Sequence, residues 1–295
     1  MHGGHDRDPN VRRMTNEEIA SAAQELEPYI VKARNLVPDS ENRIHEDSVA
    51  RQFGFRGGLV PGITTYAYMT RPVAEAWGRD WLERGSLAVK LIAPVYDGDP
   101  VVVHAQVEED GSDAARMSLR VVDPEGTVCA TGEATLPSSP TTPPDPEEYQ
   151  EAPLPPPDQR PEATPEAVEG LTVLGTVRRT FHADRAVPFL DAIDDDLDLY
   201  RDGAIAHPGW IVWDANQALA QNVDLGPWIH VATEAQHFSL VGDGDVVATR
   251  GRVVSVFERK GHWFVDLDLL IVAEGALARP VWRVRHTAIF QIARP

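Results

Sequence analysis

The sequence contains little that would tie it to a disulfide, a membrane or a nucleic acid. Cys129 is the only cysteine, so no intrachain disulfide can form. No apolar run approaches the roughly 20 residues needed to span a bilayer, and the N-terminus lacks a signal-peptide pattern. Lysine and arginine together number 27 against 46 aspartates and glutamates, which gives a net charge of −19. Nucleic acids and anionic membranes both require clustered positive charge. We therefore expect a cytoplasmic protein with neither as a partner.

Common cofactor motifs are also missing. The sequence has no phosphate loop, no dinucleotide fingerprint and no Gly-x-Ser-x-Gly elbow. One group of possible metal ligands, His230, Glu234 and His237, calls for a check. On a regular strand, residues 230 and 234 share a face that excludes residue 237, so the three side chains would not converge. We assign them structural roles and expect neither a metal nor a cofactor.

What the sequence does contain fits a globular fold. Apolar residues make up 42% of its 295 residues, and the mean hydropathy is −0.28. A chain of this length forms one large domain or two of ordinary size, each able to bury a core.

Two segments of the chain are alike. Residues 95–102 and 241–247 each place an Asp-Gly-Asp turn before a β-branched run, a pattern typical of a turn entering a strand. Each follows an apolar helical stretch with tryptophans and precedes alternating strands. The recurrence predicts two copies of one unit.

A proline-rich, acidic stretch separates the copies. It has few bulky apolar side chains, so it is predicted to be an extended or disordered linker. We expect a mobile tail over residues 1–13, an N-terminal copy over 14–136, the linker over 137–165 and a C-terminal copy over 166–295.

Each copy is predicted to wrap an antiparallel sheet around a central helix, an α+β fold. The first helix is expected to begin at about Gly62, and Pro72 is expected to restart or kink it. Strands such as 86–92 and 101–107 have the β-branched bias of a sheet. Joining the two copies edge to edge would remove an exposed edge strand.

The segment Asn42-Arg43-Ile44-His45-Glu46-Asp47 carries the chemistry. It sets an imidazole shortly before the loop Gly57-Gly58-Leu59-Val60-Pro61-Gly62, after which an apolar helix begins. A helix start presents unpaired N–H groups that can hold a developing negative charge. A base beside such an anion hole suits carbonyl chemistry.

This order of parts resembles the MaoC-like (R)-specific enoyl-CoA hydratase/dehydratase family, which has a hot-dog fold. The family motif runs Asp, any residue, Asn-Pro, apolar, His, any residue, Asp, and a His-Gly pair opens its central helix. His45, Asn42 and Asp47 match the family's His, Asn and second Asp, and Gly62 matches the helix glycine. With two copies, the resemblance implies a double hot-dog fold.

The chain departs from the family motif at three positions. Arg43 replaces the proline, Pro61 replaces the helix-opening histidine, and Ser40 stands at the catalytic aspartate. Asp39 and Glu41 flank Ser40, and a loop shift of one residue would restore a carboxylate. We favour Asp39 because the family's acid is an aspartate.

The two copies differ at the site. Alignment places Asp195 opposite Ser40 and Tyr200 opposite His45, and the loop to His207 is roughly eight residues shorter. We therefore expect one working site per chain, in an enclosed cavity at His45 lined partly by the C-terminal copy. The region around Tyr200 is expected to be filled.

The resemblance implies an acyl-thioester hydratase/dehydratase in which His45 and Asp39 are catalytic. Asn42 would orient a water or fix the loop, and the backbone N–H groups of Gly62 and Ile63 would bind the substrate carbonyl. Coenzyme A or an acyl carrier enters only as part of the substrate, and a homodimer is an expected assembly. A hot-dog thioesterase using Asp39 or Glu41, and a non-catalytic hot-dog module that binds an acyl-thioester or a partner, are the alternatives.

Overall fold

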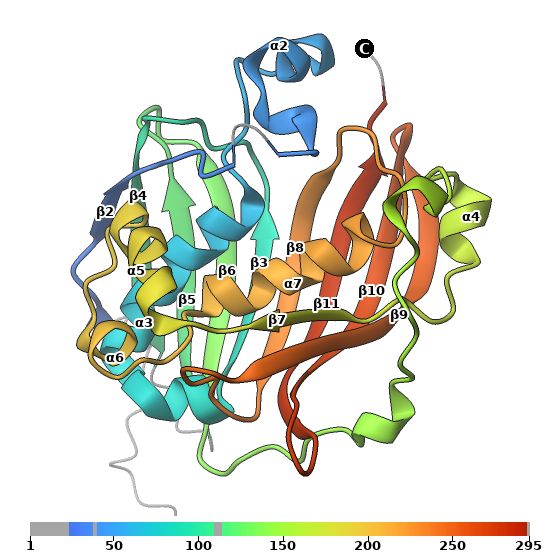
Figure 1. Cartoon of the computed structure of the whole chain (residues 1–295). Helices are drawn as coiled ribbons and strands as arrows, with labels where there is room; N and C mark the ends of the chain where they lie inside the picture. The colour runs from blue at the N-terminus through green and yellow to red at the C-terminus, as the bar shows by residue number, and fades with distance from the viewer. Residues whose placement is uncertain (1–23, 38–39, 109–113, 294–295) are drawn as a thin grey trace, which may run out of the picture.

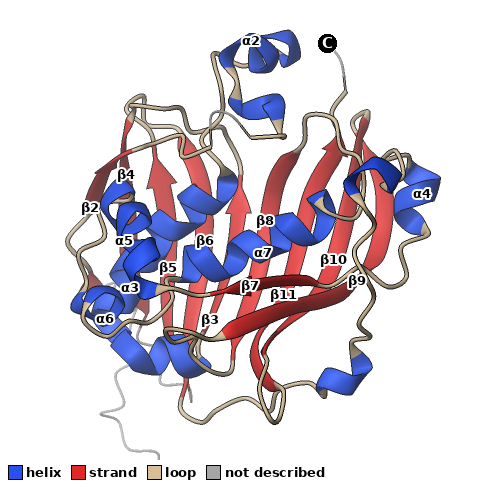
Figure 2. Ribbon diagram, viewed as in Figure 1, coloured by secondary structure: helices blue, strands red, loops and turns tan. Residues whose placement is uncertain are grey.

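A single curved sheet covered by two helices on one face is the framework of the molecule. The computed structural model describes residues 24–37, 40–108 and 114–293. Within these ranges eleven strands form one sheet in which every pairing is antiparallel. Helices α3 (Gly62–Arg84) and α7 (Pro208–Ala220) lie on the same face of it (Figure 1). Figure 2 shows the same two layers by secondary structure.

The remaining elements are short helices and the strands themselves. The strands are β1 (Gln24–Glu25), β2 (Tyr29–Lys32), β3 (Ser86–Leu91), β4 (Pro100–Glu108), β5 (Ala114–Val122), β6 (Val128–Pro137), β7 (Val177–Thr180), β8 (Ile229–His237), β9 (Val246–Arg259), β10 (His262–Ala273) and β11 (Arg279–Gln291). The short helices are η1 (Arg43–His45), α2 (Asp47–Ala50), η2 (Arg51–Phe53), η3 (Pro146–Glu148), η4 (Pro157–Gln159), α4 (Pro165–Glu169), α5 (Ala183–Ala192) and α6 (Asp198–Arg201).

The sheet joins the two halves of the chain through β3 and β8. Its strand order is β1-β4-β5-β6-β3-β8-β11-β10-β9-β7, and β2 pairs with β4. The β3–β8 pairing runs from Ser86 opposite Gln236 to Lys90 opposite Ala232. Two strands that would each be an open edge thus pair with one another. This is the edge-to-edge junction expected from the sequence.

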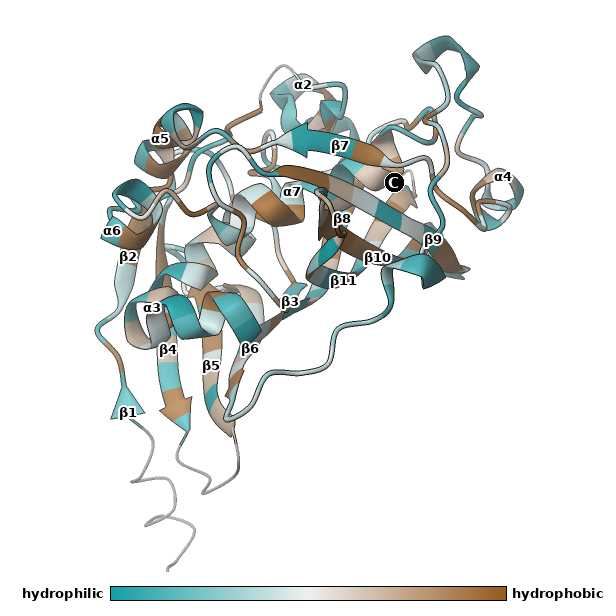
Figure 3. Ribbon diagram, turned by 60° about the horizontal axis from the view of Figure 1, so that its bottom comes forward, coloured by the Kyte–Doolittle hydropathy of each residue, from teal (hydrophilic) through white to brown (hydrophobic). Residues whose placement is uncertain are grey.

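The core lies between the helices and the sheet. Helix α3 buries Tyr66, Met69 and Val73 completely, because these residues recur on one face of the helix. A β-carbon on Gly132 of β6 would lie 2.8 Å from Met69 Cε, so glycine lets the helix approach the sheet closely. Hydrophobic residues also lie along β8 and β10, near α7 (Figure 3). In the part of the chain that the structure describes, no helix is long and apolar enough to cross a membrane.

Helix α3 breaks at a different residue from the one predicted. Pro72 is accommodated inside the helix and buried, whereas Gly78 has φ 58° and ψ −143°. Only glycine adopts such a conformation without strain, so the irregular turn falls there.

The predicted linker is extended but it is not free of the fold. Tyr149 is only 4% exposed, and its hydroxyl donates to Asp268 Oδ2 at 3.1 Å. Gln291 Nε2 donates to the carbonyl oxygen of Ala163 at 2.7 Å. The segment therefore packs along the C-terminal half. A few anchoring contacts are enough to hold it there, although its composition is unfavourable for folding alone. The predicted tail over residues 1–13 lies outside the described residues, and the domain boundaries stay predictions.

Candidate active site

The loop that carries His45 is fixed to the opposite half of the chain by Asn42. Asn42 caps η1, with its Oδ1 accepting from the N–H groups of Ile44 at 3.4 Å and Trp228 at 3.1 Å. Its Nδ2 donates to the carbonyl oxygen of Trp228 at 3.0 Å. Of the two roles that the sequence left open, these contacts support fixing the loop.

His45 presents a basic nitrogen because of the hydrogen bond on its other nitrogen. Nδ1 lies 2.7 Å from the carbonyl oxygen of Leu59. A carbonyl only accepts, so the proton of the neutral ring is on Nδ1 and Nε2 carries the lone pair. The neighbour of Nε2 is Asn42 Nδ2, at a weak 3.4 Å. Burial lowers the pKa of His45 below its usual value, an effect that the bond to Leu59 opposes. The ring is therefore a neutral base at neutral pH.

Two adjoining cavities meet at His45. The first has a volume of about 270 Å³. It is half-open, whereas the sequence predicted an enclosed cavity. Its walls are mainly apolar, formed by Ile44, Phe53, Phe55, Leu59, Leu91, Ile289 and Ile292 among others. The second, of about 600 Å³, has charged and amide side chains in its walls, among them Glu41, Arg160, Gln217, Gln221 and Asp224, together with Ser40. Both are lined by Asn42, His45, Pro61, Asn216 and Trp228. Residues from both halves thus line the site, as predicted.

The start of α3 forms one wall of the first cavity. Its first backbone bonds run from the N–H groups of Thr64 and Thr65 to the carbonyl oxygen of Pro61, and no side chain caps the helix. The N–H groups of Gly62 and Ile63 precede these bonds. Gly62 lines the cavity, whereas Ile63 is buried and lines neither cavity. The helix start therefore presents Gly62 to a ligand more directly than Ile63.

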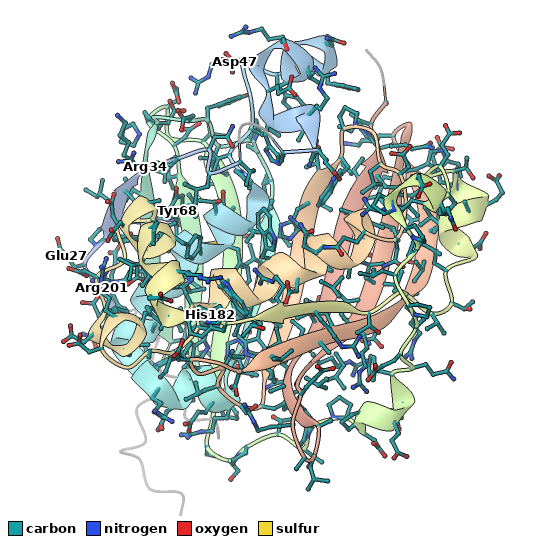
Figure 4. The ribbon with its side chains drawn as sticks, viewed as in Figure 1. Glu27, Arg34, Asp47, Tyr68, His182 and Arg201 are labelled. Carbon is teal, nitrogen blue, oxygen red and sulfur yellow. The ribbon has the colours of Figure 1, made fainter. Side chains whose placement is uncertain are left out.

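The carboxylates named from the sequence do not meet His45 in the described residues. Among these, no carboxylate is hydrogen-bonded or ion-paired to its ring. The Glu41 side chain is 93% exposed and lies 3.6 Å from Arg160 Nη1. Asp47, on α2 (Figure 4), accepts from the N–H of Gly58 and pairs with Arg51. Asp39 lies outside the described residues, and its catalytic role stays a prediction.

Two polar residues of the C-terminal half lie in the site and were not foreseen. His230, on β8, lines the first cavity, and Asn216, on α7, lines both. Asn216 Oδ1 and His230 Nδ1 are buried without a hydrogen-bond partner. The structural role assigned to His230 rested on a regular strand. A β-bulge at Val231 breaks that register, because His230 pairs with Ala288 and Ala232 with the adjacent Thr287. His230 therefore faces the cavity while Glu234 is exposed.

The corresponding region of the C-terminal half is filled by side chains, as predicted. Asp195 and His207 are each 1% exposed, and Tyr200 is 2% exposed. The Tyr200 and His207 rings lie 4.6 Å apart. Tyr200 stands at the position of the motif histidine, as aligned, but Asp195 has a histidine neighbour from outside the motif: His207 Nε2 lies 3.2 Å from Asp195 Oδ2. His207 came from the helix start, a position outside the motif that was aligned.

These contacts fix the protonation of the buried pair. His207 Nδ1 accepts from the N–H of Gly209 at 2.9 Å, so its proton is on Nε2 and points to Asp195. Burial raises the pKa of Asp195, but His207, the N–H of Leu197 and the nearby Arg71 together outweigh burial and hold that pKa below its usual value. Among the described residues, no group of three or more His, Cys, Asp or Glu side chains could hold a metal ion.

Comparison with known proteins supports the fold. No protein-family profile matches the sequence, and no curated protein matches it. Among solved structures, a conserved hypothetical protein of Mycobacterium tuberculosis described as a double hotdog fold superposes with a TM-score of 0.62 at 15% identity, over 92% of this chain and 97% of the other.

A MaoC-like dehydratase gives the same TM-score, 0.62, at 13% identity, over 92% of this chain and 98% of its own. A protein from Chloroflexus aurantiacus J-10-fl, described as a MaoC domain protein dehydratase, also reaches 0.62 at 10% identity, over 92% and 96% of the chains. The α+β class and the hot-dog resemblance are confirmed. The chain has a double hot-dog fold, of the kind found in MaoC-like dehydratases.

Proposed function

We propose that the protein is an acyl-thioester hydratase/dehydratase of the MaoC type, with one active site per chain at His45. The observation that carries this proposal is the position of the His45 ring. Its Nδ1 proton is held by Leu59, its Nε2 lone pair has only a weak 3.4 Å contact with Asn42 Nδ2, and the ring stands where the two cavities meet. An acyl chain suits the apolar cavity, and the polar arm of its thiol carrier suits the other.

The reaction needs one base and one anion-binding group. In hydration, His45 Nε2 takes a proton from water as the water oxygen bonds to Cβ of the 2-enoyl-thioester. The electron pair of the C=C bond moves to the thioester carbonyl, where the N–H of Gly62 stabilises the enolate oxygen. The imidazolium then returns its proton to Cα. Dehydration is the reverse, and no electrons are gained or lost overall.

One imidazole can therefore serve as base and acid in turn, which suits a cavity with no described carboxylate bonded to His45. The lowered pKa of His45 keeps the ring unprotonated before water adds. Asp39 is retained in this proposal as a second acid–base group.

A hot-dog thioesterase is the competing function. Glu41 and Asp224 line the second cavity, where a carboxylate could activate water against the thioester carbonyl. A protein from Novosphingobium aromaticivorans DSM 12444, described as a thioesterase, superposes with a TM-score of 0.50 at 13% identity, over 79% of this chain and 88% of the other. The fold is compatible with both reactions.

Product analysis separates the two reactions. The purified protein is incubated with crotonyl-coenzyme A and, separately, with butyryl-coenzyme A, while 3-hydroxyacyl-thioester and free thiol are both measured. We expect 3-hydroxybutyryl-coenzyme A from the first and no thiol from either. Free thiol from both substrates would establish the thioesterase instead. Binding of both without turnover would identify a non-catalytic acyl-thioester-binding protein.

A further inference from the structure

His230 lies at the start of α3 although it comes from the other half of the chain. A β-carbon built on Gly62 would be 2.7 Å from His230 Nδ1 and 2.3 Å from Leu91 Cδ1. Glycine at position 62 therefore lets the ring lie against the backbone of the first helical turn. His230 is 5% exposed, lines the first cavity, and its Nδ1 has no hydrogen-bond partner. A buried polar atom left unpaired is costly, and its position in a cavity wall points to a ligand as its partner.

The opposite edge of the ring is held by a hydrogen-bonded chain. His230 Nε2 lies 2.7 Å from Thr233 Oγ1, which lies 3.0 Å from His286 Nδ1. The rings of His230 and His286 stack with their centres 4.3 Å apart. Thr233 and His286 are themselves buried, so the arrangement has little freedom to move.

Both rings are neutral. Burial lowers the pKa of His230 to about 4, an effect that a backbone contact with Ala232 opposes. Burial, followed by the proximity of His230, lowers the pKa of His286 well below its usual value. Each neutral ring carries one N–H.

The threonine hydroxyl links the proton positions of the two rings. It has one proton, so it cannot donate to both rings, and when it donates to one ring it can accept from the other. When Thr233 donates to His230 Nε2, the His230 proton is on Nδ1, the unpartnered atom beside Gly62 in the cavity wall. A thioester carbonyl can only accept a hydrogen bond, so a bound thioester selects this arrangement.

We propose that His230 is a further catalytic residue, which donates a hydrogen bond from Nδ1 to the thioester carbonyl oxygen beside the N–H of Gly62. The inference rests on the proposed function, since it assigns the second donor of the same enolate site. His45 and His230 then act on opposite ends of the reacting group: His45 moves protons at Cα and Cβ, and His230 stabilises the charge on oxygen. The carbonyl-binding pair is thereby completed by a residue from the C-terminal half.

Three variants test this role. His230→Leu removes the donor. His230→Asn keeps an amide N–H near the Nδ1 position. Thr233→Val keeps the His230 ring but removes the hydroxyl that sets which of its nitrogens carries the proton. All are compared with the wild-type protein for folding by thermal denaturation, so that a loss of fold is not mistaken for a loss of function.

The ligands are chosen to isolate the carbonyl oxygen. Butyryl-coenzyme A labelled with ¹³C at the carbonyl is bound to each protein, and its carbonyl stretch is read by isotope-edited infrared spectroscopy. S-butyl-coenzyme A, a thioether without the carbonyl oxygen, is the matched control. Hydration of crotonyl-coenzyme A gives kcat and KM.

In His230→Leu we expect the carbonyl stretch to move to higher frequency and kcat to fall by about 100-fold, the scale of losing one oxyanion donor. The affinity for the thioester should fall by about tenfold, the effect of one hydrogen bond, and that for the thioether should not change. His230→Asn should recover most of the carbonyl shift. Thr233→Val should bind the thioester but lose part of the shift.

Equal losses for thioester and thioether would show that His230 only packs, and they would overturn the inference, as would an unshifted carbonyl. Turnover that survives in His230→Leu would overturn it while leaving the hydratase assignment intact. A carbonyl shift in a protein that turns over no thioester would overturn the hydratase assignment and leave the hydrogen bond standing. Failure to bind either ligand would overturn both.

Discussion

The two halves of the chain place a histidine beside the start of a central helix, with opposite protonation. His45 donates a hydrogen bond from Nδ1 to the carbonyl oxygen of Leu59 and carries a lone pair on Nε2. His207 accepts a hydrogen bond on Nδ1 from the backbone N–H of Gly209 and donates one from Nε2 to Asp195. One backbone contact on each ring therefore decides which nitrogen is basic.

The surroundings follow the same division. In the C-terminal half, Asp195 and Tyr200, together with Arg71 from α3, fill the space around His207, and Asp195 is hydrogen-bonded to both His207 and Arg71. Around His45 of the N-terminal half there is an open cavity, and its walls include the unpartnered Asn216 Oδ1 and His230 Nδ1 of the C-terminal half. The comparison indicates that the region around His207 contributes to the stability of the fold, whereas the region around His45 is the one open to a substrate. Each variant below tests whether that division holds.

Removing the imidazole from the open site should have the largest effect. His45→Ala should lower hydration of crotonyl-coenzyme A by about 100-fold or more, because a general acid–base group is lost. Binding of S-butyl-coenzyme A should change little, since the imidazole acts mainly in the transition state. Steady-state kinetics and calorimetry measure the two quantities. A variant that keeps its turnover would remove His45 from the mechanism.

The equivalent change in the closed site should affect stability instead. His207→Leu leaves Asp195 buried with one donor fewer, which should cost about 2 kcal/mol in the free energy of unfolding. Turnover per folded molecule should remain close to wild type. Urea denaturation provides the stability, and active-site-normalised kinetics the turnover. If His207→Leu abolished turnover in folded protein, the second copy would not be a closed site.

The two helix glycines form a matched pair for a finer test. A β-carbon on Gly62 would meet His230 and Leu91 in the cavity wall, whereas one on Gly209 would meet Ala67 Cβ at 2.8 Å and Phe189 Cζ at 3.0 Å in the core. Gly62→Ala should therefore lower kcat/KM by about tenfold, the effect of one weakened carbonyl hydrogen bond.

Gly209→Ala is the control. Overpacking should cost about 1–3 kcal/mol of stability there and leave kcat/KM of the folded protein near wild type. Denaturation and kinetics of both variants give the comparison. Equal losses of kcat/KM in the two would show that the helix starts are not functionally different.

A change of pH on the acid side of neutrality should have the smallest effect on the rate among these tests. His45 acts as a base only when neutral, and its pKa is lowered by burial. The rate should therefore be level from neutral pH down to about 6.5, the ordinary pKa of histidine, and should fall only at lower pH. The profile of kcat/KM reports this group in the free enzyme. A fall that begins above pH 6.5 would mean that the base is not the buried His45.

Much of the framework follows from local sequence patterns. The repeated Asp-Gly-Asp turns, the β-branched runs and the glycine at position 62 each specify nearby backbone, and they predict the α+β fold and the helix start. His45 was found because its neighbours form a motif within one short segment. Short-range patterns of this kind survive in a single sequence.

The missed features depend on contacts between distant segments. The alternation of β8 assigns His230 to a regular strand, and only the bulge opposite β11 turns it to the cavity. Likewise, the bond between Asp195 and His207 joins two separate short segments. Asn216 reaches the site because α7 packs against α3 of the other half. No local periodicity encodes these pairings.

The central claim is that each chain has one open site, at His45, and one closed copy of it. Titration of the protein with butyryl-coenzyme A, followed by long-range ¹H–¹⁵N spectra of the histidine rings, tests this most directly. The account predicts one equivalent of ligand per chain, displaced ring resonances for His45 and His230, and unchanged resonances for His207. Two equivalents per chain, or a displaced His207 with an undisturbed His45, would contradict it.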